Sequence, residues 1–154
     1  MAANLWAVYS AAVPTTAAMA RVATGTALKT HLQLTASGDL TVVSWGVSLE
    51  GTPSVPVYAE LINTTTVAGT GATAVTPSNL RGSTASAATA GFAPSAEGTV
   101  VATTRVFDTA IMLSPFYEHE WSLGREPILD SGQVLRVRLT TATTINALCW
   151  IIYE

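Results

Sequence analysis

The sequence has few charged residues. Charged side chains make up 11% of the 154 residues, which is less than half of the ~25% found in an ordinary soluble domain. The net charge of -3 comes from ten acidic and seven basic residues, and the basic residues form no cluster beyond the alternating pair Arg136 and Arg138. Nucleic-acid binding requires a basic surface, so we expect none.

Cysteine and histidine are scarce as well, with one Cys and two His in the chain. Cys149 lies in an apolar run and has no partner for an intrachain disulfide, so we predict a small buried side chain; a reactive thiol or an interchain bridge is the alternative. The densest polar cluster is Glu118-His119-Glu120, whose carboxylates share one face of a strand while His119 takes the other. Because metal ligands usually converge from several strands, we interpret this cluster as a solvated or interface rim and expect no metal or cofactor.

Signatures of catalysis are missing. Ser114, His119 and Asp108 supply the residue types of a catalytic triad, but no Gly-x-Ser-x-Gly motif accompanies them. The glycine-rich piece 68–72 is not followed by the Lys and helix that a phosphate-binding loop needs. We therefore expect that the protein is not an enzyme.

Long apolar runs are also absent. No stretch of about 20 apolar residues, the length that spans a membrane as a helix, occurs in the sequence. Residues 1–20 contain small and apolar residues but lack the basic start of a secretory signal. We therefore expect neither a membrane partner nor export.

Alternation of large and small side chains is the main structural signal, and it is clearest at 41–49. The heavy row consists of Val43, Trp45, Val47 and Leu49, and the opposite row of Val42, Ser44, Gly46 and Ser48. This pattern predicts a central strand with the heavy row buried. Gly46 leaves a notch in the opposite row, where a bulky side chain or another backbone can approach closely.

Similar alternation predicts further strands along the chain, with residues 1–24 as an N-terminal arm or first strand and 25–154 as one domain. Residues 63–97, rich in Thr, Ala, Ser and Gly, are expected to form long loops with one or two thin strands, which cover other chains or are covered by them. The other predicted strands lie at 4–10, 27–35, 55–62, 98–109, around 116–121, at 134–141 and at 145–153. Eight or nine strands without an amphipathic helix predict an all-β fold, an antiparallel β-sandwich or jelly roll.

A weakly charged surface favours contact with other chains, because charge normally keeps monomers apart. We therefore expect an oligomer. Arg136 and Arg138 alternate with an apolar row, which places them on the outer face of a sheet, available to Glu118, Glu120 or acids of another chain; a solvated face is the alternative. The candidate protein-interface residues are Leu5, Trp6, Tyr9, Arg81, Phe92, Phe116, Tyr117, Trp121, Arg136 and Arg138.

Several short motifs occur in an order that resembles small structural proteins of tailed bacteriophages. They are Trp-Gly-Val-Ser-Leu-Glu-Gly-Thr at 45–52, Val-Tyr-Ala-Glu-Leu at 57–61 followed by a Thr-Ala-Gly run, the 90–98 segment with Pro94, Gly-Arg-Glu-Pro-Ile at 124–128 and Trp-Ile-Ile-Tyr-Glu at 150–154. The resemblance covers about residues 25–154. It implies a capsid decoration (cement) protein, a β-sandwich or jelly-roll homotrimer held on the outer shell at local threefold positions.

The sequence thus leads to a hypothesis of a non-enzymatic virion protein, made in the host cytoplasm, that trimerises and binds the major capsid protein on the capsid surface. Such a protein stabilises the shell by its binding free energy, repeated over many sites. The alternative is a carbohydrate- or receptor-binding module of a phage tail or head fibre. That function needs exposed Trp and Tyr side chains as stacking platforms.

Overall fold

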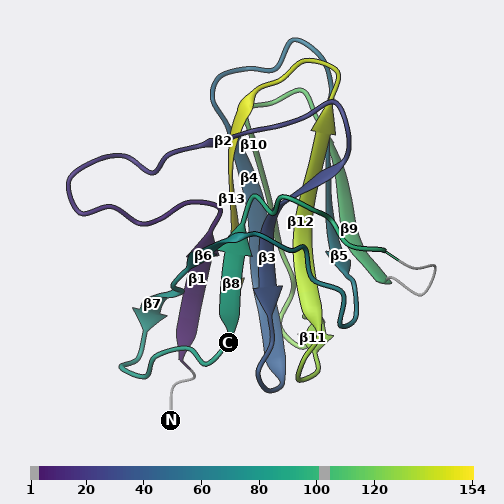
Figure 1. Cartoon of the computed structure of the whole chain (residues 1–154). Coiled ribbons are helices and arrows are strands. Elements are labelled where there is room, and N and C mark those ends of the chain that lie inside the picture. Colours follow the sequence, from purple (N-terminus) through teal and green to yellow (C-terminus); the bar gives the residue numbers. More distant parts are fainter. Residues whose placement is uncertain (1–3, 101–104) are drawn as a thin grey trace.

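Two antiparallel sheets packed against each other form the body of the protein in this computed structural model, which describes residues 4–100 and 105–154 (Figure 1). No helix occurs in these ranges, so the predicted all-β sandwich is confirmed. The strands are β1 (Leu5–Tyr9), β2 (Val22–Ala23), β3 (Lys29–Thr35), β4 (Leu40–Leu49), β5 (Val57–Asn63), β6 (Thr73–Val75), β7 (Ser78–Arg81), β8 (Thr89–Phe92), β9 (Arg105–Met112), β10 (Phe116–Glu120), β11 (Ile128–Leu129), β12 (Val134–Thr141) and β13 (Asn146–Tyr153).

The strand order is that of a jelly roll. The first sheet runs β10-β4-β13-β1-β7, with β11 also beside β4 and β2 beside β13, and the second runs β6-β8-β3-β12-β5-β9. The chain forms one long antiparallel ribbon that is folded over on itself. Its successive strand pairs are β1 with β13, β3 with β12, β4 with β10, and β5 with β9. Rolling such a ribbon into two four-stranded sheets gives the jelly-roll arrangement.

The core lies between the sheets, and β4 supplies much of it as a central strand between β10 and β13, as predicted. Trp45, Val47 and Leu49 are buried there, but Val42 takes the next inward position in place of Val43. Val43 is the extra residue of a bulge, because consecutive residues of β13 pair with residues two apart on β4. The prediction of an unbroken heavy row was therefore wrong at this end.

The notch at Gly46 is confirmed. Trp150 of β13 is the register partner of Gly46, and a Cβ on Gly46 would lie 2.2 Å from Trp150 Cζ2 and 2.7 Å from the backbone oxygen of Tyr117. Trp150 also packs its ring against Phe116, with centroids 5.6 Å apart. Glycine therefore permits a large indole to lie flat on the outer face of the first sheet.

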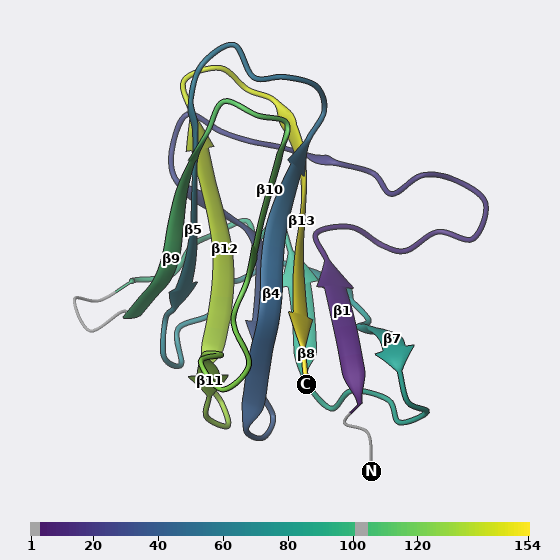
Figure 2. The same cartoon turned by 180° about the vertical axis from the view of Figure 1, so that it is seen from behind.

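The threonine-rich segment 63–97 closes one side of the sandwich. It contains three short strands, one more than the upper number predicted: β6 and β8 extend the second sheet beyond β3, and β7 extends the first sheet beyond β1. Figure 2 shows β1 and β7 on one side of the molecule and β9 on the other. The free edges of the two sheets, β9 and β10, therefore lie on the side that this segment leaves open.

Candidate functional site

Exposed apolar side chains gather along the open side of the sandwich, at β9, β10 and β11. In the part of the chain that the structure describes, five large apolar side chains are more than half exposed, and all lie between residues 111 and 128. They are Ile111 (70%), Leu113 (62%), Phe116 (53%), Leu123 (97%) and Ile128 (60%), here termed the β9–β10 edge. Ile111 and Phe116 lie on the edge strands β9 and β10, whereas the other three lie on connections or on β11: Leu113, Leu123 and Ile128.

Asp108 of β9 connects the two sheets at this edge. Its Oδ2 accepts hydrogen bonds from Trp45 Nε1 at 3.0 Å and from the Tyr117 hydroxyl at 2.7 Å, and it lies 3.2 Å from His119 Nδ1. Trp45 belongs to β4 and the other two residues to β10, so one carboxylate of the second sheet contacts three groups of the first. Two pairs of aromatic rings lie around it, with Tyr117 edge-on to Trp45 and His119 tilted against Trp121.

The Asp108 cluster has the hydrogen bonding of a structural link. Burial, and then the neighbouring carboxylate of Asp108, raise the pKa of the Tyr117 hydroxyl above its ordinary value, so the hydroxyl stays protonated and donates. The structure brings His119 and Asp108 together, whereas Ser114 lies before β10 and its hydroxyl accepts a hydrogen bond from the Phe116 N–H. The three residue types of a triad are thus not assembled in one place.

The Glu-His-Glu cluster has the predicted alternation, because Glu118 and Glu120 are exposed while His119 turns toward Asp108. Among residues 4–100 and 105–154, no group of three His, Cys, Asp or Glu side chains is placed to hold a metal ion. These same residues form no apolar helix of membrane-spanning length. Cys149 is fully buried, as predicted, and its burial raises the pKa of the thiol to about 12.

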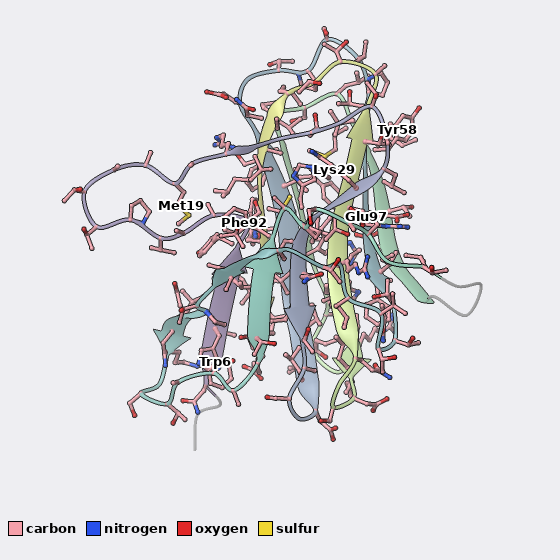
Figure 3. The ribbon with its side chains drawn as sticks, viewed as in Figure 1. Trp6, Met19, Lys29, Tyr58, Phe92 and Glu97 are labelled. Atoms are coloured by element: carbon pink, nitrogen blue, oxygen red, sulfur yellow. The ribbon has the colours of Figure 1, made fainter. Side chains whose placement is uncertain are left out.

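The outer face of the second sheet carries Arg136, which the chain itself covers. The guanidinium is fully buried, donates to the carbonyl oxygen of Glu97 at 2.6 Å and to that of Val67, and lies 3.4 Å from the Glu97 carboxylate. That carboxylate accepts two further hydrogen bonds, both 2.6 Å long, from the backbone N–H and the hydroxyl of Thr30. Figure 3 shows Glu97 on the connection that follows β8 and passes over this sheet.

The predicted partners of the two arginines are therefore corrected. Arg138 pairs with Glu60 of the neighbouring strand, and Arg136 pairs with Glu97, so neither contacts Glu118 or Glu120. Both arginines do point away from the core, as expected. The segment that ends at Glu97 folds back over this face, which leaves Arg136 no exposed surface for another chain.

The other predicted interface residues divide into two groups. Leu5, Trp6, Tyr9, Phe92, Tyr117 and Trp121 are half-buried, and Arg81 and Phe116 are exposed. Trp6 stacks on Tyr153 and donates to the backbone oxygen of Thr84, and Arg81 pairs with Glu154 at 2.8 Å. Phe116 alone of these residues belongs to the β9–β10 edge.

Four residues of this edge, Ile111, Leu113, Leu123 and Ile128, were not predicted as interface residues. Two signals in the sequence point to three of them. Ile111-Met112-Leu113 is apolar on both faces of a strand, and Leu123 precedes Gly124 at a turn, where apolar residues are uncommon.

Comparison of the chain with protein-family models, curated proteins and solved structures finds no match.

Proposed function

We propose that this chain is a structural virion protein that binds the outside of a tailed-phage capsid as an oligomer and stabilises the lattice of the major capsid protein. The observation that carries the proposal is the β9–β10 edge, where five large apolar side chains are more than half exposed. Removing such groups from water contributes roughly 25 cal/mol per Å² of apolar surface buried. The assignment to a phage capsid rests on the order of motifs in the sequence.

The hydrogen bonds of Asp108, which link the two sheets at this edge, support the proposal. Asp108 joins β9 to both β4 and β10, so the strands that carry Ile111 and Phe116 are connected to each other. A surface that is already ordered loses little conformational entropy on binding. Each bound copy then stabilises the assembled lattice by mass action, because it has affinity for the assembled shell and not for free subunits.

The proposal is tested by co-sedimentation with capsids of the encoding phage assembled without this protein. The wild-type chain is expected to pellet with the shells, and Leu123→Asp is expected to bind at least tenfold more weakly because a charge replaces a buried apolar contact. Glu118→Gln, which changes an exposed side chain of β10 without adding a charge, is the matched control. Wild-type protein that stays in the supernatant would reject the proposal.

A carbohydrate- or receptor-binding module of a phage tail or head fibre is the second candidate. A cavity of about 290 Å³ at the other end of the first sheet supports it, because half-buried Trp6 lines that cavity together with Asp39 and Ser86; Tyr153, also in the lining, is itself buried. Aromatic faces, hydroxyls and carboxylates are groups that can contact sugar rings and their hydroxyls. Glycan-array binding that is lost in Trp6→Ala would favour this function over the first.

A further inference from the structure

The connection between β1 and β2 is much longer than the fold requires. Both strands lie along the same side of β13 and run antiparallel to it, so β2 continues the line of β1. Ser10 exchanges hydrogen bonds with Cys149, and Val22 pairs with Ala147 two residues further along. One residue opposite Leu148 would complete an unbroken strand here, yet the chain has residues 11–21 between Ser10 and Val22.

Residues 11–21, here termed the projecting loop, leave the body of the protein and return to it. Figures 1 and 2 show the loop extending sideways from the sandwich on the β1 side. Residues 12–20 carry no charged side chain and, apart from half-buried Met19, are all exposed. Ordering such a segment costs conformational entropy, and contacts with its own chain offset little of that cost. An uncharged loop of this length, surplus to the topology, indicates a contact with another chain.

An apolar groove lies on the opposite side of the domain, on the outer face of the second sheet. It has a volume of about 280 Å³ and is lined by Leu28, Tyr58, Glu60, Thr109, Ile111 and Thr140. Tyr58 pairs in register with Ile111 on one side and with Thr140 on the other, so the three side chains form a row across adjacent strands. The carboxylate of Glu60 is paired with Arg138, so the groove presents no unpaired charge.

We propose that the projecting loop of one copy of this chain lies in the groove of a second copy. The electrostatics match, because an uncharged segment enters a groove whose one carboxylate is already neutralised, and burial leaves no charge without a partner. Figure 3 places Met19 of the loop and Tyr58 of the groove on opposite sides of the molecule. The contact is therefore head-to-tail between copies, and such contacts generate a ring if the rotation closes.

This inference rests on the self-association contained in the proposed function. It assigns that self-association to the projecting loop and to a groove that shares Ile111 with the β9–β10 edge but does not include Leu123. The test uses two variants of the full chain: one lacks residues 12–20, and the other carries Tyr58→Asp in the groove. Sedimentation equilibrium is expected to give an oligomer for the wild type and a monomer for each variant alone. An equimolar mixture is expected to give a dimer, because the intact loop of one variant enters the intact groove of the other.

A second loop variant, Val13→Asp, keeps the loop length and is expected to behave like the deletion. Circular dichroism and thermal unfolding check that each variant folds, and Leu123→Asp, which alters a more exposed residue elsewhere, is expected to retain the wild-type mass. A monomeric wild type, variants that retain the wild-type mass, or a mixture that stays monomeric would overturn the inference. Loss of capsid binding in Leu123→Asp with an unchanged mass would leave the proposed function standing independently of these results.

Discussion

The carboxylate of Asp108 accepts a hydrogen bond from the indole N–H of Trp45 at 3.0 Å, across the boundary between the two sheets. Trp45 is fully buried, and its N–H would have no partner if the carboxylate were removed. The same oxygen accepts from Tyr117, which lies on the edge strand of the first sheet. A single side chain of β9 thus accepts the hydrogen bond of a buried indole N–H and also links β9 to β10, the two edge strands of the surface on which the proposed function depends.

Asp108→Ala is expected to destabilise the protein by roughly 2–3 kcal/mol, because it leaves a buried N–H and a half-buried hydroxyl without their acceptor. Urea denaturation followed by tryptophan fluorescence measures the change. Asp108→Asn keeps one acceptor oxygen and should cost less. Equal stabilities of the wild type and the alanine variant would contradict the structural role assigned to this carboxylate.

Gly46→Ala is expected to destabilise the first sheet by about 1–3 kcal/mol, because the new methyl group would overlap both Trp150 and the backbone oxygen of Tyr117. Gly38 provides the matched control, since no atom lies within 4 Å of a Cβ placed there. The midpoint of thermal unfolding is expected to fall for Gly46→Ala and to stay close to wild type for Gly38→Ala. The reverse order would show that Trp150 does not lie on Gly46.

Glu97→Ala is expected to release the segment that covers the second sheet. The substitution removes three hydrogen-bonding contacts and leaves the buried guanidinium of Arg136 with backbone acceptors only. Because Glu97 is partly exposed, we expect a loss of roughly 2 kcal/mol rather than the larger cost of breaking a fully buried pair. Limited proteolysis should then cut within 64–97 faster than in the wild type, while Glu118→Ala should leave the cleavage rate unchanged.

His31 is expected to make the protein less stable in mild acid. The residue is the extra residue of a bulge on β3, it is fully buried, and neither ring nitrogen has a hydrogen-bond partner among the described residues. Burial, with a smaller effect of nearby Lys29, lowers its pKa from 6.5 to about 4. The unfolded chain therefore binds a proton first, and stability falls as the pH drops from about 6.5 toward 4.

The lost stability amounts to roughly 3 kcal/mol over that pH range, after which the contribution of His31 levels off. Urea denaturation at a series of pH values measures it. Because other groups also titrate, the difference between the wild type and His31→Gln isolates the histidine. Identical pH dependences for the two proteins would contradict the neutral, buried state of this side chain.

Periodicity in the sequence predicted the strands well where one face is buried, as in 134–141, which coincides with β12. It failed at the bulge of Val43, because an inserted residue reverses the alternation without changing composition. It also failed for the partner of Arg136, since Glu97 is 39 residues away and reaches the arginine only after the intervening segment has folded back.

The exposed residues of the candidate surface were hard to predict for a related reason. Ile111 and Leu123 have the side chains of core residues, and only their positions on an edge strand and in a turn leave them exposed. Which strands form the edges is set by the order of strands in both sheets. Local patterns in the sequence do not contain that order.

If the proposed function holds, the chain comes from a tailed phage, and cryo-electron microscopy of mature particles of that phage tests the proposal most directly. The account predicts jelly-roll density on the outer surface of the capsid, with Leu123 and Ile128 at the contact with the major capsid protein and neighbouring copies joined through residues 12–20. A capsid whose exterior carries no such density, or density in which the β9–β10 edge faces solvent, would contradict it.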